Sequence, residues 1–283
     1  MKKAIGTIIG SLIFILIILA VFSSIFFITN QMFSLFSNQI TKLSFESEKQ
    51  NEKLEIISSA FDKYLPKRFL ITVAESSSGN IFSLIKPLDD NFLTLTGSSI
   101  EVIFNFEEIS RPTLMTEIRI SIFFSYILSS DVTQRVFIFN WNTNSWFLAD
   151  TLTITPPESG QFAQRLITVD NPSLYIHANS TVKVRITASS ASSFNAYYDF
   201  ISLKIENNDV NKTVATYILN NSPFSSKIVS VIVFNNTRFE RFDLNITIPS
   251  SSLFLIKINT NITNSNIKFI TNLGNIFQST ISN

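Results

Sequence analysis

The sequence predicts a long N-terminal transmembrane α-helix followed by an all-β ectodomain, which comprises a larger β-sandwich and a smaller C-terminal β-sandwich. Three observations predict this fold class. After Lys2 and Lys3, the chain carries no charged residue until Lys42. Beyond Pro66, apolar residues recur at every second position, as in strands with one buried face. A polar run at residues 207–213 then separates two such regions.

The N-terminal segment has the dimensions of a membrane span. As a helix that rises about 1.5 Å per residue, Ile5–Ile28 is roughly 36 Å long, and the hydrocarbon layer of a bilayer is about 30 Å thick. Positive charges next to a span favour the cytoplasmic side. Lys2 and Lys3 therefore predict an N-terminus on the cytoplasmic side of the cell membrane and an ectodomain on the outer side.

Three kinds of segment begin with lysines and an apolar run: a secretory signal, a permanent anchor and a pilin-type leader. A secretory signal has about 7–15 apolar residues before a small-x-small cleavage site. The apolar run here is longer, and residues 20–22 and 22–24 match such a site poorly. The anchor and the leader therefore remain as alternatives.

The residues at the start of the run favour the leader. Lys2-Lys3-Ala4, followed by Ile5-Gly6-Thr7-Ile8-Ile9-Gly10, resembles the class III leader of archaeal type IV pilins and archaellins. The resemblance implies that a prepilin peptidase removes residues 1–4 by cutting between Ala4 and Ile5. It also implies that the remaining helix polymerises with copies of itself or with other pilin-like subunits. Gly6 and Gly10 have the small-xxx-small spacing that lets apolar helices approach closely.

The helical pattern continues beyond the span. Apolar residues repeat at spacings of three and four through Leu54, Ile57, Phe61 and Leu65, and Pro66 ends the pattern. We therefore expect one helix over residues 5–65, with its membrane part at about 5–29. The alternative is two shorter helices that are broken around Asn30 or Lys49.

Composition argues against several classes of function. With a net charge of +1 and 15% charged residues, the chain has no basic field for a nucleic acid. It has no cysteine and one histidine, His177, which we place at a strand end, so we expect no metal site and no cofactor. The acidic pairs at 89–90 and 107–108 are interpreted as surface charge. We expect no enzymatic activity.

The alternation is clearest at residues 118–122 and 182–186, and an antiparallel sandwich over residues 66–206 accounts for it. We predict further strands at 69–73, 81–85, 92–95, 100–106, 135–139, 146–148, 152–155, 164–168, 173–177 and 200–205. Residues 88–92, 137–146, 182–186 and 197–200 resemble those of galactose-binding or discoidin-like jelly rolls. That resemblance implies a jelly-roll-like sandwich that binds sugars or other surfaces through loops at one end.

Trp141 and Trp146 are the candidate ligand contacts, because a sugar can stack on an exposed indole. They flank a polar hairpin turn at residues 142–145. The alternative is that both tryptophans pack across or cap the sandwich. Asp89, Asp90, Asp150 and Asp199 lack the spacing of a known calcium loop, and solvated turns together with a buried, hydrogen-bonded Asp199 account for them more simply.

Residues 214–283 are expected to form the second sandwich after the linker at 207–213. Apolar and polar residues alternate over 242–248, and further strands are predicted at 231–234, 254–258 and 267–270. Residues 217–222 and 245–249 resemble the small β-domains of archaeal pilin-like proteins. The alternative is that this segment completes the first sandwich.

The ectodomain contains six candidate N-glycosylation sequons, no more than its composition predicts by chance. Asn245 is expected to face solvent, because its neighbours Leu244 and Ile246 would face the core. The sequons begin at Asn179, Asn211, Asn220, Asn235, Asn245 and Asn261.

Two classes of function follow. The first is a pilin-like subunit of an extracellular filament that displays β-domains for adhesion. The second is a monomeric, membrane-anchored protein whose sandwich binds a glycan or a surface-layer partner.

Overall fold

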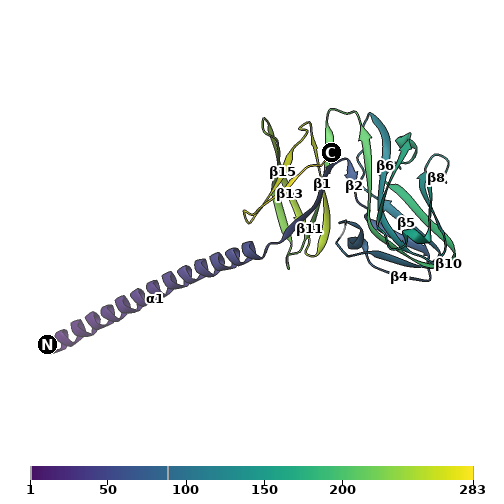
Figure 1. Ribbon diagram of the computed structural model, residues 1–283. Helices are drawn as coiled ribbons and strands as arrows, with labels where there is room; N and C mark the ends of the chain where they lie inside the picture. Colours follow the sequence, from purple (N-terminus) through teal and green to yellow (C-terminus); the bar gives the residue numbers. More distant parts are fainter. Residues whose placement is uncertain (1, 88, 283) are drawn as a thin grey trace.

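The computed structural model describes the backbone of residues 2–87 and 89–282, and side chains from Ile13 onward. The chain forms one long N-terminal helix, α1 (Lys2–Asn51), followed by two β-sandwiches. Figure 1 shows α1 projecting from the smaller sandwich, with the larger one on the far side. The fold class predicted from the sequence is confirmed.

Helix α1 stands clear of the β-structure. Its apolar side chains are exposed along its length, from Ile13 (51% exposed) to Leu43 (70%). The segment Ile13–Asn51 is long and apolar enough to cross a membrane. The described residues at the cleavage junction, Lys2, Lys3, Ala4 and Ile5, and the Gly6–Gly10 pair lie in the first turns of α1, and their side-chain surroundings are outside the described part of the chain.

Helix α1 ends at Asn51, which is 14 residues before the predicted end at Leu65. Residues 54–61 instead form strand β1 (Leu54–Phe61), which pairs with β11 (Lys212–Asn220). The amide of Asn275 donates to the Lys49 carbonyl (2.8 Å) and to the Glu52 carboxylate (2.9 Å). The first bond satisfies a backbone carbonyl that the helix end leaves without a partner, so a distant loop stabilises the early end of α1.

The larger sandwich is a jelly roll whose two long strands run through both layers. Strands β5 (Leu93–Phe106) and β10 (Val182–Asn207) pair along their length. In the first layer, β10 also pairs with β7 (Val132–Asn140), which pairs with β8 (Ser145–Ile154). Strand β3 (Arg68–Val73) closes the other side of this layer against β5.

In the second layer, β10 pairs with β6 (Met115–Ile127), and β9 (Ala163–Asp170) follows β6. Short strands β2 (Lys63–Tyr64) and β4 (Ser76–Ser78) add to β10 and β5. Inward apolar side chains of both layers form one core, which includes Phe104, Ile120 and Val184. The core is continuous because inward and outward residues alternate along each strand.

Two predicted strands are wrong. Residues 81–84 form the 3-10 helix η1 (Ile81–Leu84), and residues 172–174 form η3 (Pro172–Leu174). The Asn80 side chain caps η1 by accepting from the backbone N–H of Phe82 at 2.9 Å. His177 therefore lies in a turn after η3 rather than at a strand end, and its N–H donates to the Thr181 carbonyl. A third 3-10 helix is η2 (Pro156–Glu158).

The smaller sandwich is assembled from both ends of the β-region. One sheet contains β1, β11 and β14 (Ser252–Thr260). The other contains β13 (Phe239–Ile248), β12 (Ser226–Phe234), β15 (Asn266–Thr271) and β16 (Ile276–Thr280). Because β1 precedes the jelly roll and β11 follows it, the jelly roll is inserted into the smaller sandwich. The predicted linker is shorter than expected, since β10 reaches Asn207 and β11 begins at Lys212.

Strand β11 joins the two cores. Val214 and Ile218 face the core of the smaller sandwich, whereas Ala215 and Tyr217 face that of the jelly roll. The Tyr217 hydroxyl accepts a hydrogen bond from the Leu65 N–H at 2.9 Å. Strand β11 is therefore buried on both faces and contributes to the cores of both sandwiches.

Candidate glycan-binding surfaces

The two tryptophans lie on the outer face of the first jelly-roll layer. Outward side chains of β7, the β7–β8 turn, β8 and β10 form a surface that we call the tryptophan face; its members are Phe137, Phe139, Trp141, Trp146, Lys183 and Arg185. Phe139 contacts both indoles edge-on, with ring centroids 4.7 Å from Trp141 and 5.1 Å from Trp146. Figure 1 shows β8 on the side of the molecule far from α1.

Cationic side chains lie over these rings. The Arg185 guanidinium is 4.4 Å from the centroid of Phe137 and 4.6 Å from that of Trp146. The Lys183 ammonium is 5.0 Å from the centroid of Trp141. Each such contact stabilises by about 0.5–1 kcal/mol at an exposed site and more when water is excluded. The face is therefore a preorganised ladder of alternating aromatic and cationic groups.

The two tryptophans differ in their surroundings. Trp141 packs against His177, with ring centroids 4.2 Å apart, and its backbone N–H donates to the Leu174 carbonyl. Its indole N–H is buried and has no partner among the described residues. Trp146 is the second residue of β8 and precedes Phe147 and Leu148, which are 49% and 47% exposed. Both indoles are half-buried, and each packs on neighbouring side chains, Trp141 on His177 and Trp146 on Phe139 and Arg185.

Polar groups of β5 flank the ladder. Asn105 lies opposite Lys183, and Glu101 lies opposite Thr187, so their side chains share the outer face. The Glu101 carboxylate is 3.8 Å from the Arg185 guanidinium. The tryptophan face thus offers aromatic surface, an amide, a carboxylate and two cations on one rigid sheet.

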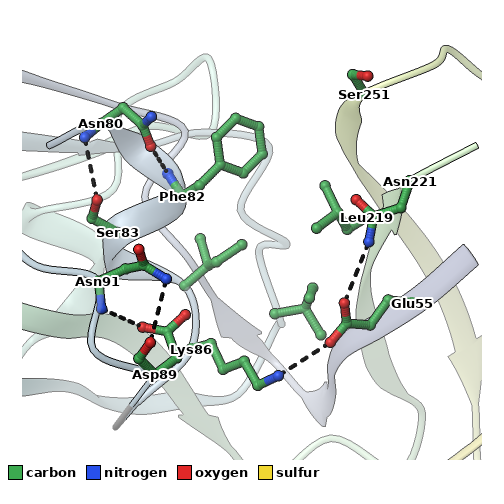
Figure 2. Close-up of a pocket in the computed structure, with 12 residues that line it drawn as sticks. Glu55, Asn80, Phe82, Ser83, Lys86, Asp89, Asn91, Leu219, Asn221 and Ser251 are labelled. Carbon is green, nitrogen blue, oxygen red and sulfur yellow. Dashed lines mark hydrogen bonds and ion pairs between the residues drawn. The ribbon is translucent and has the colours of Figure 1, made fainter. Parts of the chain in front are cut away.

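A second concave region lies between the two sandwiches, and we call it the junction cleft. Its first pocket encloses about 410 Å³ and is shown in Figure 2. One wall carries Asn80, Phe82 and Asn91, and the opposite wall carries Glu55 and Asn221. A second pocket of about 450 Å³ adjoins it through Phe82 and Ser251, which line both.

Hydrogen bonds hold the polar walls of the junction cleft in place. Lys86 forms an ion pair with Glu55 at 3.2 Å. The Asp89 carboxylate accepts from the backbone N–H of Asn91 at 3.1 Å. The second pocket is more apolar, with Leu65, Ile81, Tyr217, Leu253 and Leu255 among its lining residues.

The other candidate groups do not form a site. Asp150 pairs with Arg165, and Asp199 is buried. Tyr126 donates to Gln134 and contacts Tyr198 in the core, where burial raises the pKa of both tyrosines and keeps them protonated. Among the described residues, no three histidine or acidic side chains are grouped to hold a metal ion. Glu107 and Glu108 form ion pairs with Lys67, and these three side chains line the second pocket of the junction cleft.

Sequence reasoning predicted the tryptophan hairpin but not the junction cleft. The hairpin is local, and Asn140 closes its turn by accepting from the N–H groups of Asn142 and Thr143. The cleft brings Asn80, Asn91 and Asn221 together from separate segments. The one local feature of the sequence that points to the cleft is the pair of asparagines, Asn80 and Asn91, on either side of residues 81–90.

No protein-family model matches the sequence, and no curated protein matches it. Solved structures with a similar fold include the CBM22-1 xylan-binding domain from Paenibacillus barcinonensis Xyn10C. That match has 8% identity and a TM-score of 0.36, and it covers 55% of this chain and 97% of that one. The xylan-binding module CBM15 matches with 15% identity over 56% of this chain and 99% of that one, with a TM-score of 0.33.

A third similar structure is CBM28, a carbohydrate-binding module specific for non-crystalline cellulose. It matches with 11% identity and a TM-score of 0.28, and the match covers 52% of this chain and 87% of that one. These similarities span about half of this chain.

Proposed function

We propose that this protein is anchored in a cell membrane by α1 and binds carbohydrate through the tryptophan face of its jelly roll. The single observation that carries this proposal is the ladder formed by Trp146, Phe139 and Arg185 on an outer sheet face. Sugars present apolar faces that pack on aromatic rings and hydroxyls that bond to amides and charged groups.

The position of the face supports the same function. Lys2 and Lys3 favour a cytoplasmic N-terminus, so the β-region would lie outside the cell. Strand β8, which carries Trp146, is on the side of the jelly roll away from α1 (Figure 1). A ligand beyond the membrane would therefore meet this face first.

The test uses the full chain in detergent micelles on a glycan array, followed by calorimetric titration with the glycans that bind. We expect Trp146→Ala to weaken binding at least tenfold, because it removes the indole that contacts both Phe139 and Arg185 in the ladder. The control is Phe239→Ala, which removes a 75% exposed ring from the smaller sandwich. Unchanged affinity in Trp146→Ala for every glycan that binds, or no bound glycan with the wild type, would contradict the proposal.

One observation favours a second candidate, a pilin-like subunit of a surface filament. The uncharged part of α1, Ala4–Thr41, is about 57 Å long at about 1.5 Å per residue, well beyond a hydrocarbon layer of about 30 Å. Past the predicted membrane part, Phe33, Leu35 and Ile40 are each more than 60% exposed. Copies of the same helix would cover these side chains in a filament.

The test of the second candidate is the N-terminal sequence of protein taken from the cell surface, together with electron microscopy of the same preparation. A mature start at Ile5, produced by a prepilin peptidase, and the presence of filaments would support it. An intact Met1 with no filaments would contradict it and support the anchored monomer.

A further inference from the structure

We infer that the junction cleft is a second ligand site, which takes a short, neutral, polyhydroxylated ligand such as an oligosaccharide. This inference does not depend on the tryptophan face, because the two sites share no residue. It rests on the size of the cleft, on its polar walls, on its low net charge and on the place of Phe82 between its two pockets.

The cleft has the volume of a ligand site. The adjoining pockets enclose about 410 and 450 Å³, and binding pockets are typically about 300–1,000 Å³. Phe82 is 38% exposed and separates the pockets. Its ring therefore offers an apolar platform that a ligand can reach from either pocket.

The walls carry planar polar groups that are held in place. The Asn80 amide is fixed by its bond to the Phe82 N–H, and Asp89 is fixed by its bond to the Asn91 N–H. Across the gap, the Asn221 amide lies 3.5 Å from the Glu55 carboxylate (Figure 2). Amides and carboxylates in such positions bond to neighbouring hydroxyls, and preorganisation lowers the entropy cost of binding.

The charges of the first pocket favour a neutral ligand. Lys86 is paired with Glu55, which leaves Asp89 as the remaining charged lining residue. The two carboxylates repel an anion, and the carboxylate of Asp89 already accepts a hydrogen bond from the Asn91 N–H. Hydroxyl groups bond to all three side chains without a charge of their own.

The cleft also joins the two sandwiches. Glu55 and Asn221 belong to the smaller sandwich and its following loop, whereas Asn80, Phe82 and Asn91 belong to the jelly roll. A ligand that bonds to both walls would stabilise their relative position, since it binds the folded arrangement alone. We therefore expect the ligand to raise the melting temperature of the whole β-region.

The experiment distinguishes the two sites because only one of them contains tryptophan. The chain has two tryptophans, and both belong to the tryptophan face. Calorimetric titration reports all binding, whereas intrinsic tryptophan fluorescence reports binding near Trp141 and Trp146. The probes are hexasaccharides of β-1,4-linked glucose, β-1,4-linked xylose and α-1,4-linked glucose, added to the full chain in detergent.

We expect one of these probes to bind with no change in tryptophan fluorescence and with unchanged affinity in Trp146→Ala. Phe82→Ala should weaken that binding at least tenfold, and so should Asn221→Ala, which truncates an exposed side chain. The matched control is Phe162→Ala, because Phe162 is 39% exposed but lies outside the cleft.

Three results would overturn the inference. The first is equal binding by Phe82→Ala, Asn221→Ala and Phe162→Ala. The second is loss of all binding in Trp146→Ala, which would leave the tryptophan face as the one glycan site. The third is binding of a capped extended hexapeptide but of no hexasaccharide, which would assign the cleft to polypeptide along Ser251–Leu255 of the smaller sandwich.

Discussion

Arg165 and Asp150 join the two layers of the jelly roll at one open edge. The guanidinium Nε lies 2.7 Å from Oδ2 of the carboxylate, and Nη2 lies 2.8 Å from Oδ1. Arg165 belongs to β9 of the second layer, and Asp150 belongs to β8 of the first. A bidentate pair of this kind fixes both distance and orientation, so it holds the layers together where strands β8 and β9 do not pair.

Arg165→Lys tests this contact. Lysine keeps the charge but loses the two parallel N–H bonds, so we expect the free energy of unfolding to fall by about 0.5–1 kcal/mol. The Arg165 side chain is 41% exposed, which keeps the effect at this modest size. Thermal melting followed by circular dichroism would measure it. A double-mutant cycle with Asp150→Asn should recover the same coupling energy, and a coupling near zero would contradict the role.

Asp62 predicts a dependence of stability on pH. It lies between β1 and β2, is 1% exposed and accepts from the Asn207 amide at 2.8 Å. Burial raises the pKa of its carboxyl above the ordinary 3.8, and the bond from Asn207 opposes that rise. The folded chain therefore holds this proton more tightly than the unfolded chain.

The direction of the pH dependence follows from this difference in pKa between the folded and the unfolded chain. The contribution of Asp62 is fully present below pH 3.8 and is lost as the pH rises through the raised folded pKa. We expect Asp62→Asn to remove this loss, so that its melting temperature depends less on pH above about 4 than that of the wild type. The control is Asp243→Asn in an exposed ion pair. Parallel pH profiles for Asp62→Asn and the wild type would contradict the prediction.

The early end of α1 shows which part of the fold sequence reasoning misses. Leu54, Ile57 and Phe61 fit a helical stripe, yet they face two different cores from strand β1. Their pairing with β11 comes from a segment that follows the whole jelly roll in the chain. Strand pairing between segments so far apart in the chain overrides local periodicity. At residues 118–122 and 182–186, by contrast, the alternation of apolar and polar residues directly shows which face of the strand is buried.

The candidate sites divide in the same way. Trp141 and Trp146 flank one turn, so their proximity follows from local pattern. The opposition of Asn80 and Asn221 depends on the insertion of the jelly roll between β1 and β11, which no local pattern records. The packing of Trp141 on His177 was likewise missed, because His177 was expected at a strand end.

Asn220 is expected to be essential for the smaller sandwich. Its side chain is 0% exposed, and its amide nitrogen lies 3.0–3.1 Å from the carbonyl oxygens of Phe224, Ile248 and Pro249. Asn220→Ala leaves buried carbonyl groups without a donor, which costs about 1–3 kcal/mol. Thermal melting would measure the loss, and Asn245→Ala on an exposed position of β13 should change stability by less than about 0.5 kcal/mol. Equal melting temperatures for the two variants would contradict this prediction.

The burial of Asn220 also predicts which sequons are open to glycosylation. Attachment needs an accessible amide, and the Asn220 amide is enclosed by three carbonyls. Four sequon asparagines are exposed, and Asn235 is partly buried by bonds within its own turn; the exposed ones are Asn179, Asn211, Asn245 and Asn261. Asn245 faces solvent as the alternation predicted. Glycopeptide mass spectrometry of protein from the native cell surface should therefore find no glycan on Asn220, and any occupied site should be one of the other five. A glycan on Asn220 would contradict the fold of the loop between β11 and β12.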